Sequence, residues 1–144
     1  MSFLSFLFGE QENAPPPDPY WQRDSSLKFY RLLGLRPGRP PKLKGAGGVF
    51  AVFHRGVKPG WVYVGATRDL GAAVERLQDH PEVSEMEARG GLYITWAFIK
   101  DDKRDGVVAY LREQLKPEIV DPEMDREMGC NPDKAKPIPV QRPW

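Results

Sequence analysis

Cysteine and histidine are scarce in this chain of 144 residues. Cys130 is the single cysteine, and the two histidines are His54 and His80. One cysteine cannot form an intramolecular disulfide, and these three residues do not have the spacing of a structural zinc site. We therefore expect a fold that depends on its apolar core, with no bound metal or other cofactor.

The sequence near the N-terminus has no long hydrophobic run. Its longest mainly apolar stretch covers residues 3–8, and no basic residue precedes it. A transmembrane helix needs about 20 such residues, and a standard secretory signal begins with a cationic segment. We therefore expect a cytoplasmic protein without a transmembrane segment.

This short apolar stretch can instead form a docking surface. Acidic residues follow it at Glu10 and Glu12, whereas helices bound to a membrane surface usually carry basic residues that attract anionic lipids. We therefore favour docking on a protein, with peripheral membrane contact as the alternative. The predicted docking residues are Phe3, Leu4, Phe6, Leu7 and Phe8.

Proline is rare in the middle of the chain. Of the 15 prolines, only Pro59 and Pro81 lie between Lys42 and Lys116. The others lie in flanking regions, where they favour extended backbone. The distribution predicts three parts: an N-terminal extension with a proline-rich linker (1–41), a compact domain (42–121) and an extended C-terminal tail (122–144).

Local patterns in the compact domain predict its strands and helices. Residues 48–53 and 61–64 are rich in β-branched and aromatic residues and flank a turn, which is typical of a β-hairpin. Apolar residues at helical spacing predict a helix over about 70–80 and another that ends near Pro117, and residues 92–99 predict a third strand between them. The order β-β-α-β-α predicts an α+β fold with a small antiparallel three-stranded sheet flanked by helices. A short amphipathic helix over residues 27–33 is expected in the extension.

Two short motifs in the hairpin resemble the GIY-YIG nuclease domain. They are Gly48-Val49-Phe50 and Tyr63-Val64-Gly65, and a helix follows the second. Leu115-Lys116-Pro117 also resembles the end of the family's last helix, so the likeness covers about residues 45–120. It implies a GIY-YIG-like fold and a nuclease site in which tyrosines and an arginine lie near the phosphate and a glutamate holds one divalent metal.

Several positions depart from the pattern that this resemblance implies. Tyr63 is retained, although a tyrosine here can also simply pack in the hairpin, but Phe50 replaces the tyrosine of the first motif and has no hydroxyl. The arginine position falls on Ala73, with the nearest arginine, Arg76, three residues later.

The metal ligand is also replaced. The family's glutamate position falls on Val108, which cannot bind Mg²⁺, and an asparagine position falls on Val120. Asp105 is a possible substitute one turn before Val108, and Glu113 lies further along the same helix. The residues left as candidates for a vestigial site are Phe50, Tyr63, Arg76 and Asp105.

Acidic residues are missing from one long stretch. The chain has a net charge of +1, but from Ser25 to Arg68 it contains nine Lys or Arg and no Asp or Glu, while the rest of the chain carries −8. Such a cluster can neutralise phosphates, and together with the resemblance it indicates a nucleic acid as the partner. The predicted contact residues are Lys42, Lys44, Arg55, Lys58, Arg68 and Arg76.

Three functions fit these observations. The leading hypothesis is a binding module for nucleic acid that has the GIY-YIG-like fold but has lost catalysis. The second is a divergent endonuclease dependent on Mg²⁺ or Mn²⁺, with Tyr63, Arg76 and Asp105 in displaced roles. The third is an adaptor that binds a protein or a membrane surface through the apolar stretch or the proline-rich ends. An acidic protein, or the chain's own acidic C-terminal half, can also satisfy the basic stretch.

Overall fold

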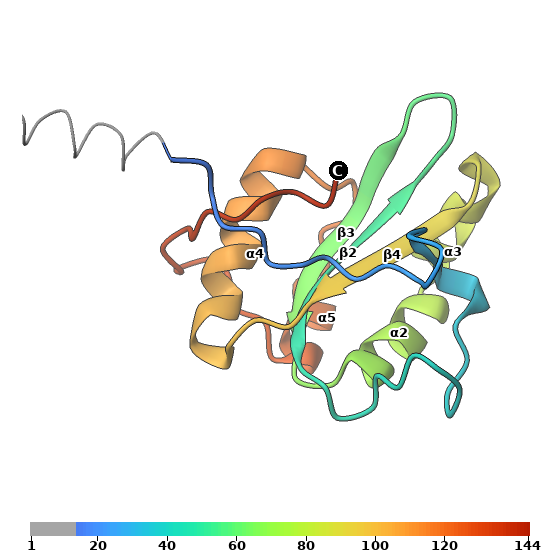
Figure 1. Cartoon of the computed structure of the whole chain (residues 1–144), viewed down its shortest axis with the longest axis horizontal. Coiled ribbons are helices and arrows are strands. Elements are labelled where there is room, and N and C mark those ends of the chain that lie inside the picture. The colour runs from blue at the N-terminus through green and yellow to red at the C-terminus, as the bar shows by residue number, and fades with distance from the viewer. Residues whose placement is uncertain (1–13) are drawn as a thin grey trace, which may run out of the picture.

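A four-stranded antiparallel sheet runs through the centre of the fold (Figure 1). The computed structural model describes residues 14–144. In their order across the sheet the strands are β1 (Tyr30–Arg31), β4 (Leu92–Ala97), β2 (Gly48–His54) and β3 (Gly60–Thr67). The predicted α+β class and the antiparallel sheet are confirmed.

The sheet has one strand more than the sequence predicted. Tyr30 pairs with Ile94 and Arg31 with Tyr93, and the chain then makes a single 3-10 turn, η1 (Leu32–Gly34). The helix predicted over residues 27–33 is therefore wrong. The free edge of β4 offers backbone partners to this segment, and tertiary pairing of this kind overrides a weak local helical pattern.

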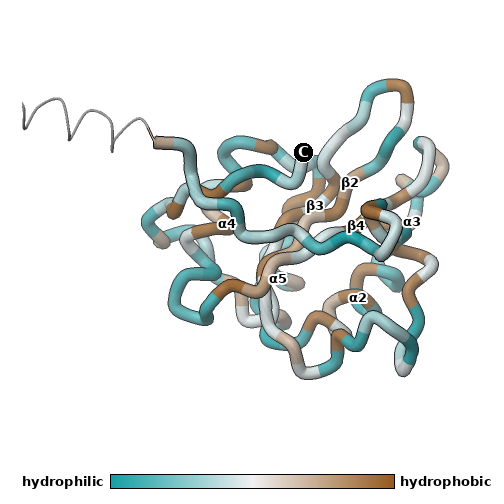
Figure 2. Tube along the Cα trace, viewed as in Figure 1, coloured by the Kyte–Doolittle hydropathy of each residue, from teal (hydrophilic) through white to brown (hydrophobic). Residues whose placement is uncertain are grey.

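Strand β2 divides the core into two sides. All seven of its residues are buried, and residues 49–53 alternate between two clusters of apolar side chains. Phe50 and Val52 pack with α2 (Leu70–Gln78), whereas Val49, Ala51 and Phe53 pack with α4 (Asp101–Leu115). Figure 2 shows the apolar residues gathered along the middle of the hairpin. This alternation explains why the strand is apolar throughout, since both of its faces are covered.

Local capping chemistry marks the start of helix α2. The Asp69 side chain accepts a hydrogen bond from the backbone N–H of Ala72 and so caps α2. After α2 come α3 (Pro81–Glu85) and the 3-10 helix η2 (Met86–Arg89), which leads into β4. Helix α4 ends at Lys116, whose φ of 49° is left-handed. The elements predicted for residues 48–117 therefore form close to their predicted ranges.

The prediction of an extended tail from residue 122 is wrong for its first part. Pro122–Met128 forms a helix, α5, with Asp121 as its N-cap and Gly129 in the left-handed conformation at its end. Proline is favoured at the first position of a helix and glycine just past its end, so the local chemistry is that of an ordinary short helix. Met124 and Met128 of α5 are buried in the core on the α2 side.

Two extended arms, residues 16–22 and 138–144, lie side by side against the fold. The Gln141 backbone N–H donates to the Pro17 carbonyl (3.0 Å), and the Trp21 indole N–H donates to the Gln141 carbonyl (2.7 Å). Trp144 stacks on Trp61 with ring centroids 4.6 Å apart. The arms are extended as predicted for proline-rich segments, but they are packed rather than free.

The predicted docking residues Phe3, Leu4, Phe6, Leu7 and Phe8 lie outside the residues that the structure describes. Among the helices of residues 14–144, none has both the length and the apolar character needed to cross a bilayer.

Gly65 is needed because two aromatic rings approach it closely. It lies inside β3 opposite Phe50, and a Cβ at this position would lie 2.9 Å from Cε1 of Tyr63 and 3.0 Å from Cζ of Phe50. We therefore expect Gly65→Ala to lower the free energy of unfolding by about 1 to 3 kcal/mol, the usual cost of overpacking a core. Urea denaturation measures this loss. Gly34→Ala is the control, because its Cβ would meet only Arg31 Cβ at an ordinary 3.5 Å; an equal loss in both variants would contradict the explanation.

Candidate functional site

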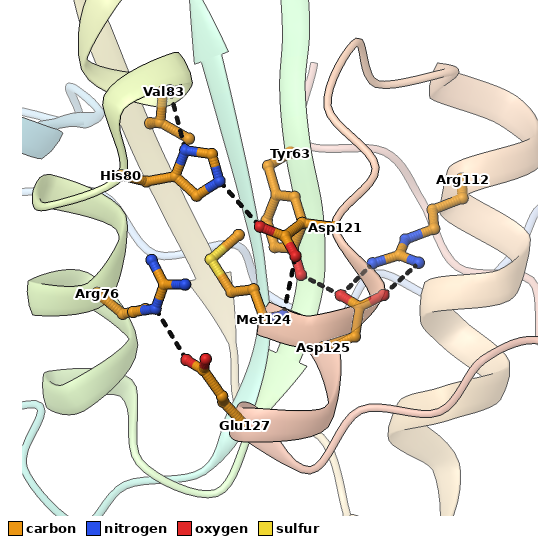
Figure 3. A network of polar contacts seen from close by, with 9 residues as sticks. All are labelled: Tyr63, Arg76, His80, Val83, Arg112, Asp121, Met124, Asp125 and Glu127. Carbon is orange, nitrogen blue, oxygen red and sulfur yellow. Dashed lines mark hydrogen bonds and ion pairs between the residues drawn. The ribbon is translucent and has the colours of Figure 1, made fainter.

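Tyr63 lies in a buried network of polar contacts between β3, α4 and α5 (Figure 3). Its hydroxyl donates a hydrogen bond to Oδ1 of Asp125. The guanidinium of Arg112 donates to both carboxylate oxygens of Asp125, at 2.8 and 3.1 Å, and its Nε donates to the Val64 carbonyl at 2.9 Å. The ring of Phe50 stacks on that of Tyr63 with centroids 5.8 Å apart, and both rings are fully buried.

The electrostatics of this network keep Tyr63 a hydrogen-bond donor. Burial raises the pKa of Tyr63 far above its usual value, and the hydrogen bond to Asp125 raises it further. Burial by itself lowers the pKa of Arg112, but the hydrogen bonds and charge of Asp125 outweigh this effect, so the pKa is raised overall and the guanidinium stays charged. The Tyr63 hydroxyl is therefore protonated, bonded within the protein and shielded from solvent.

Arg76 and His80 contact the same helix from the α2 side. Arg76 Nε donates to Oε2 of Glu127 at 2.8 Å, which raises the pKa of Arg76. His80 Nε2 lies 3.0 Å from Oδ2 of Asp121, the residue that caps α5 by accepting from the Met124 backbone N–H. In Figure 3 these contacts and those of Asp125 surround α5 on both sides.

Asp105 is bonded to the residues that follow α5. Its Oδ1 accepts a hydrogen bond from the backbone N–H of Asn131 at 2.9 Å. Residues 121–131, here called the covering segment, thus contact each polar candidate of the vestigial site: Tyr63 through Asp125, Arg76 through Glu127, and Asp105 through Asn131. The candidates meet on a segment of the chain itself rather than on an open concave face.

The positions that the resemblance gave to the arginine and the glutamate lie on opposite sides of the sheet. Ala73 is buried on the α2 side, in the cluster that contains Tyr63, whereas Val108 is buried on the α4 side. The α4 residue that reaches Tyr63 is Arg112, one turn after Val108. Within residues 14–144, no three side chains of His, Cys, Asp or Glu lie close enough together to hold a metal ion.

Sequence reasoning missed Arg112, Asp121 and Asp125. The prediction of an extended tail allowed the acidic C-terminal half to pair with the basic stretch, but it did not predict a contact between these acids and Tyr63, Arg76 or Arg112. Asp121-Pro122 and Gly129 are the start and stop signals of a short helix, so α5 itself could be predicted from the sequence. The contact of that helix with Tyr63 is tertiary and has no local signal.

The predicted nucleic-acid residues fall into separate groups. Lys42 and Lys44 precede β2, and Arg68 follows β3, so these three belong to one end of the hairpin. Arg55 and Lys58 belong to the turn at the other end, and because β2 has seven residues of about 3.3 Å rise, the groups are roughly 20 Å apart. Arg76 is bonded to Glu127. The six residues therefore do not form one continuous patch.

The basic stretch keeps its charge on the surface. Of its nine Lys and Arg, Arg31 forms an ion pair, with Glu87, and the other eight form none within residues 14–144. Three of the four acids of α5 and its cap pair elsewhere: Asp125 with Arg112, Glu127 with Arg76, and Asp121 with His80. Within residues 14–144, the acidic C-terminal half of the chain therefore pairs with this stretch only through Glu87, and the other eight basic residues have no ion-pair partner.

A cavity of about 610 Å³ lies between residues 35–44 and α2. Its lining is mainly apolar, with Leu35, Leu43 and Val74 among the buried residues. Its charged lining residues are four basic ones, Arg36, Arg39, Lys42 and Lys44, and two acidic ones, Asp69 and Glu75. We call this cavity the basic pocket. A second cavity, at the hairpin turn, is lined by Lys58 and Arg89, of which Arg89 is paired with Glu118.

Comparisons of the chain with protein-family models, with curated proteins and with solved structures find no match.

The stability of the fold should depend strongly on the Asp125 carboxylate. Asp125→Ala leaves Arg112 as a largely buried charge without its partner, and we expect the free energy of unfolding to fall by about 3 to 5 kcal/mol. Tyr63→Phe removes one hydrogen bond to a charged group and should cost about 1.5 to 3 kcal/mol. Urea denaturation at neutral pH measures both losses.

Glu127→Ala is the matched control for these variants. Its partner Arg76 is about one third exposed, and Glu127 itself is nearly half exposed, so the change should cost less than about 1 kcal/mol. Equal losses for Asp125→Ala and Glu127→Ala would show that the buried network has no special role.

The stability should also depend on pH through Asp121. Its hydrogen bond from the Met124 N–H, and then that from His80, lowers its pKa below the ordinary 3.8. A carboxyl whose pKa is lowered by folding stabilises the fold above its unfolded pKa, and this stabilisation is lost as the pH falls through the lower, folded pKa. An asparagine at this position can still cap the helix but does not titrate. We expect the wild type to be more stable than Asp121→Asn at about pH 6 and the difference to shrink towards about pH 2.

Urea midpoints measured over this pH range test the expectation. Asp133→Asn is the control, because the exposed Asp133 side chain forms no hydrogen bond within the described part of the chain. A difference between wild type and Asp121→Asn that is constant with pH would contradict the role given to this carboxylate.

Proposed function

We propose that the protein is a nucleic-acid-binding module with a GIY-YIG-like domain that has lost nuclease catalysis, and that the residues around the basic pocket form its main contact surface. The observation that carries the proposal is the set of eight basic residues in 25–68 that form no ion pair within residues 14–144. Unpaired surface charge of one sign favours a polyanionic partner.

The fold supports the family part of the proposal. The hairpin β2–β3, helix α2, strand β4 and helix α4 follow one another in the order that the resemblance implies, and Phe50 and Tyr63 stack across the hairpin. Other elements add to this arrangement: β1 lies at an edge of the sheet, α5 lies beside β3, and the short helices α3 and η2 lie between α2 and β4.

The covering segment supports the loss of catalysis. Phosphodiester hydrolysis needs hydroxyl and guanidinium groups that are free to reach a phosphate and a water. Phe50 has no hydroxyl, and the Tyr63 hydroxyl and the Arg76 guanidinium are bonded to Asp125 and Glu127. A substrate would have to replace two carboxylates and displace a helix whose methionines are buried.

The basic pocket supports the choice of surface. Arg36, Arg39, Lys42 and Lys44 lie within nine residues of one another in sequence and line one cavity. Lys42 and Lys44 were already expected to contact nucleic acid, and Arg68 precedes the helix on the other side of the cavity. Arg55 and Lys58, at the far end of the hairpin, extend the contact only for a partner long enough to reach both groups.

Neutralising two lysines at the pocket tests the proposal. We expect Lys42→Gln/Lys44→Gln to weaken binding to nucleic acid by about tenfold at moderate salt. The negative slope of log K, the association constant, against log salt should become shallower by about 2, since each phosphate contact contributes about 1. Fluorescence anisotropy with labelled DNA and RNA over about 50 to 200 mM salt measures both quantities. Lys100→Gln/Lys103→Gln, which removes two exposed lysines near the start of α4, is the control and should change the slope by less.

Two results would contradict the proposal. If the wild type binds neither DNA nor RNA in a salt-dependent way, the proposal is wrong and the adaptor hypothesis is favoured. If the protein nicks plasmid DNA with Mg²⁺ or Mn²⁺, and Tyr63→Phe or Asp105→Ala abolishes the nicking, the divergent nuclease is correct instead.

A further inference from the structure

The loop that forms the basic pocket is attached to both ends of α2. At the start of the helix, Asp69 Oδ1 accepts from the Gly45 N–H (3.0 Å), the Leu70 N–H donates to the Ala46 carbonyl (2.7 Å), and the Gly71 N–H donates to the Leu43 carbonyl (3.1 Å). Near the end of the helix, the Gln78 amide donates to the carbonyls of Leu32 and Leu35, both at 2.9 Å. The loop therefore spans the length of α2.

The segment between these attachments is rich in proline, although it also contains Gly38. Pro37, Pro40 and Pro41 fix their own φ angles and leave few conformations open to it. A loop held at both ends and stiffened in the middle keeps the pocket formed before a ligand arrives, which lowers the entropy cost of binding. Its volume of about 610 Å³ lies within the range of about 300 to 1,000 Å³ that is typical of small-molecule sites.

The chemistry of the pocket is divided between an apolar floor and a charged lining. Leu35, Leu43 and Val74 are buried, whereas Arg39, Lys42 and Lys44 are exposed. The guanidinium of Arg36 is held by the carbonyls of Leu33 (2.7 Å) and Leu35 (3.1 Å). Phosphate contact alone needs no apolar concavity, so the site fits a ligand that has a flat apolar part joined to an anion.

An unpaired nucleotide has this combination of properties. An unstacked base can enter an apolar pocket and stack on an arginine plane, while its phosphates contact Lys42 and Lys44. A base in a duplex cannot enter without the cost of leaving the stack. Glu75, exposed on α2 and also lining the pocket, offers a carboxylate that can accept hydrogen bonds from base amino groups.

We infer that the basic pocket takes one unpaired nucleotide of a single-stranded nucleic acid, with the base between the loop and α2 and the phosphates on the surrounding lysines and arginines. This inference rests on the proposed function and narrows it from nucleic acid in general to single strands. Hydrogen bonds from base amino groups to Glu75 would then favour bases that carry an amino group.

Oligonucleotides that differ in one feature test the inference on the full chain. We expect a labelled single strand to bind at least about tenfold more tightly than the duplex of the same sequence, and a strand with abasic sites to lose most of this advantage. A free nucleoside monophosphate should compete, weakly, for the same site. Equal binding of single strand, abasic strand and duplex would overturn the inference.

A variant that fills the pocket gives a second test. Ala72 is exposed on α2 and lines the pocket, so Ala72→Trp should block the base without changing the charge and weaken single-strand binding by about tenfold, with duplex binding unchanged. Ala88→Trp, an exposed alanine at the second cavity, is the matched control. Circular dichroism and thermal unfolding are used to check that both variants fold.

The outcomes separate the inference from the proposed function. If Ala72→Trp binds single strands as the wild type does while Lys42→Gln/Lys44→Gln weakens binding, the inference fails and the proposed function stands. If a polyglutamate peptide binds more tightly than any oligonucleotide and Ala72→Trp blocks it, the occupant is an acidic peptide and the inference is overturned. If nothing anionic binds, both fail.

Discussion

A carboxylate removed from water must be compensated by an opposite charge and by hydrogen bonds, and the place of α5 depends on how Asp125 meets this requirement. Arg112 of α4 supplies the charge and two hydrogen bonds, and Tyr63 of β3 supplies a third. One carboxylate thus joins three elements that are separate in sequence. With α5 held there, Met124 and Met128 complete the core beside β3, and the rings of Phe50 and Tyr63 are sealed from solvent.

The pairing of acidic residues near α5 also affects which basic residues of the chain remain unpaired. Three of the four acidic residues of the covering segment are bonded to Arg112, Arg76 and His80, all of which lie outside the basic stretch of residues 25–68. The basic stretch is therefore left with surface charge, although the whole chain carries only +1. The near-neutral total thus combines two uses of charge: a buried carboxylate, Asp125, that is paired and fixes a helix, and basic residues that are exposed beside a pocket.

The hairpin, α2, β4 and α4 could be predicted from the sequence because their signals are local: β-branched and aromatic runs, a capping Asp69 and apolar stripes at helical spacing. Strand β1 could not, since two residues become a strand only by pairing with the edge of β4. Helix α5 had local signals, Asp121-Pro122 and Gly129, but the abundance of proline favoured a tail. Tyr63, Arg76 and Asp105 contact different residues of the covering segment, and no sequence signal links these pairs. Asp125, for example, lies 62 residues from Tyr63.

The two arms have a consequence for how the fold opens. Residues 16–22 and 138–144 are bonded to each other through Gln141, and from there to the rest of the fold through Trp144 on Trp61 and Gln22 on Trp96. Each arm has part of its support in the other, so release of one weakens the hold on both. We therefore expect the two arms to open together in local unfolding, even though more than a hundred residues separate them along the chain.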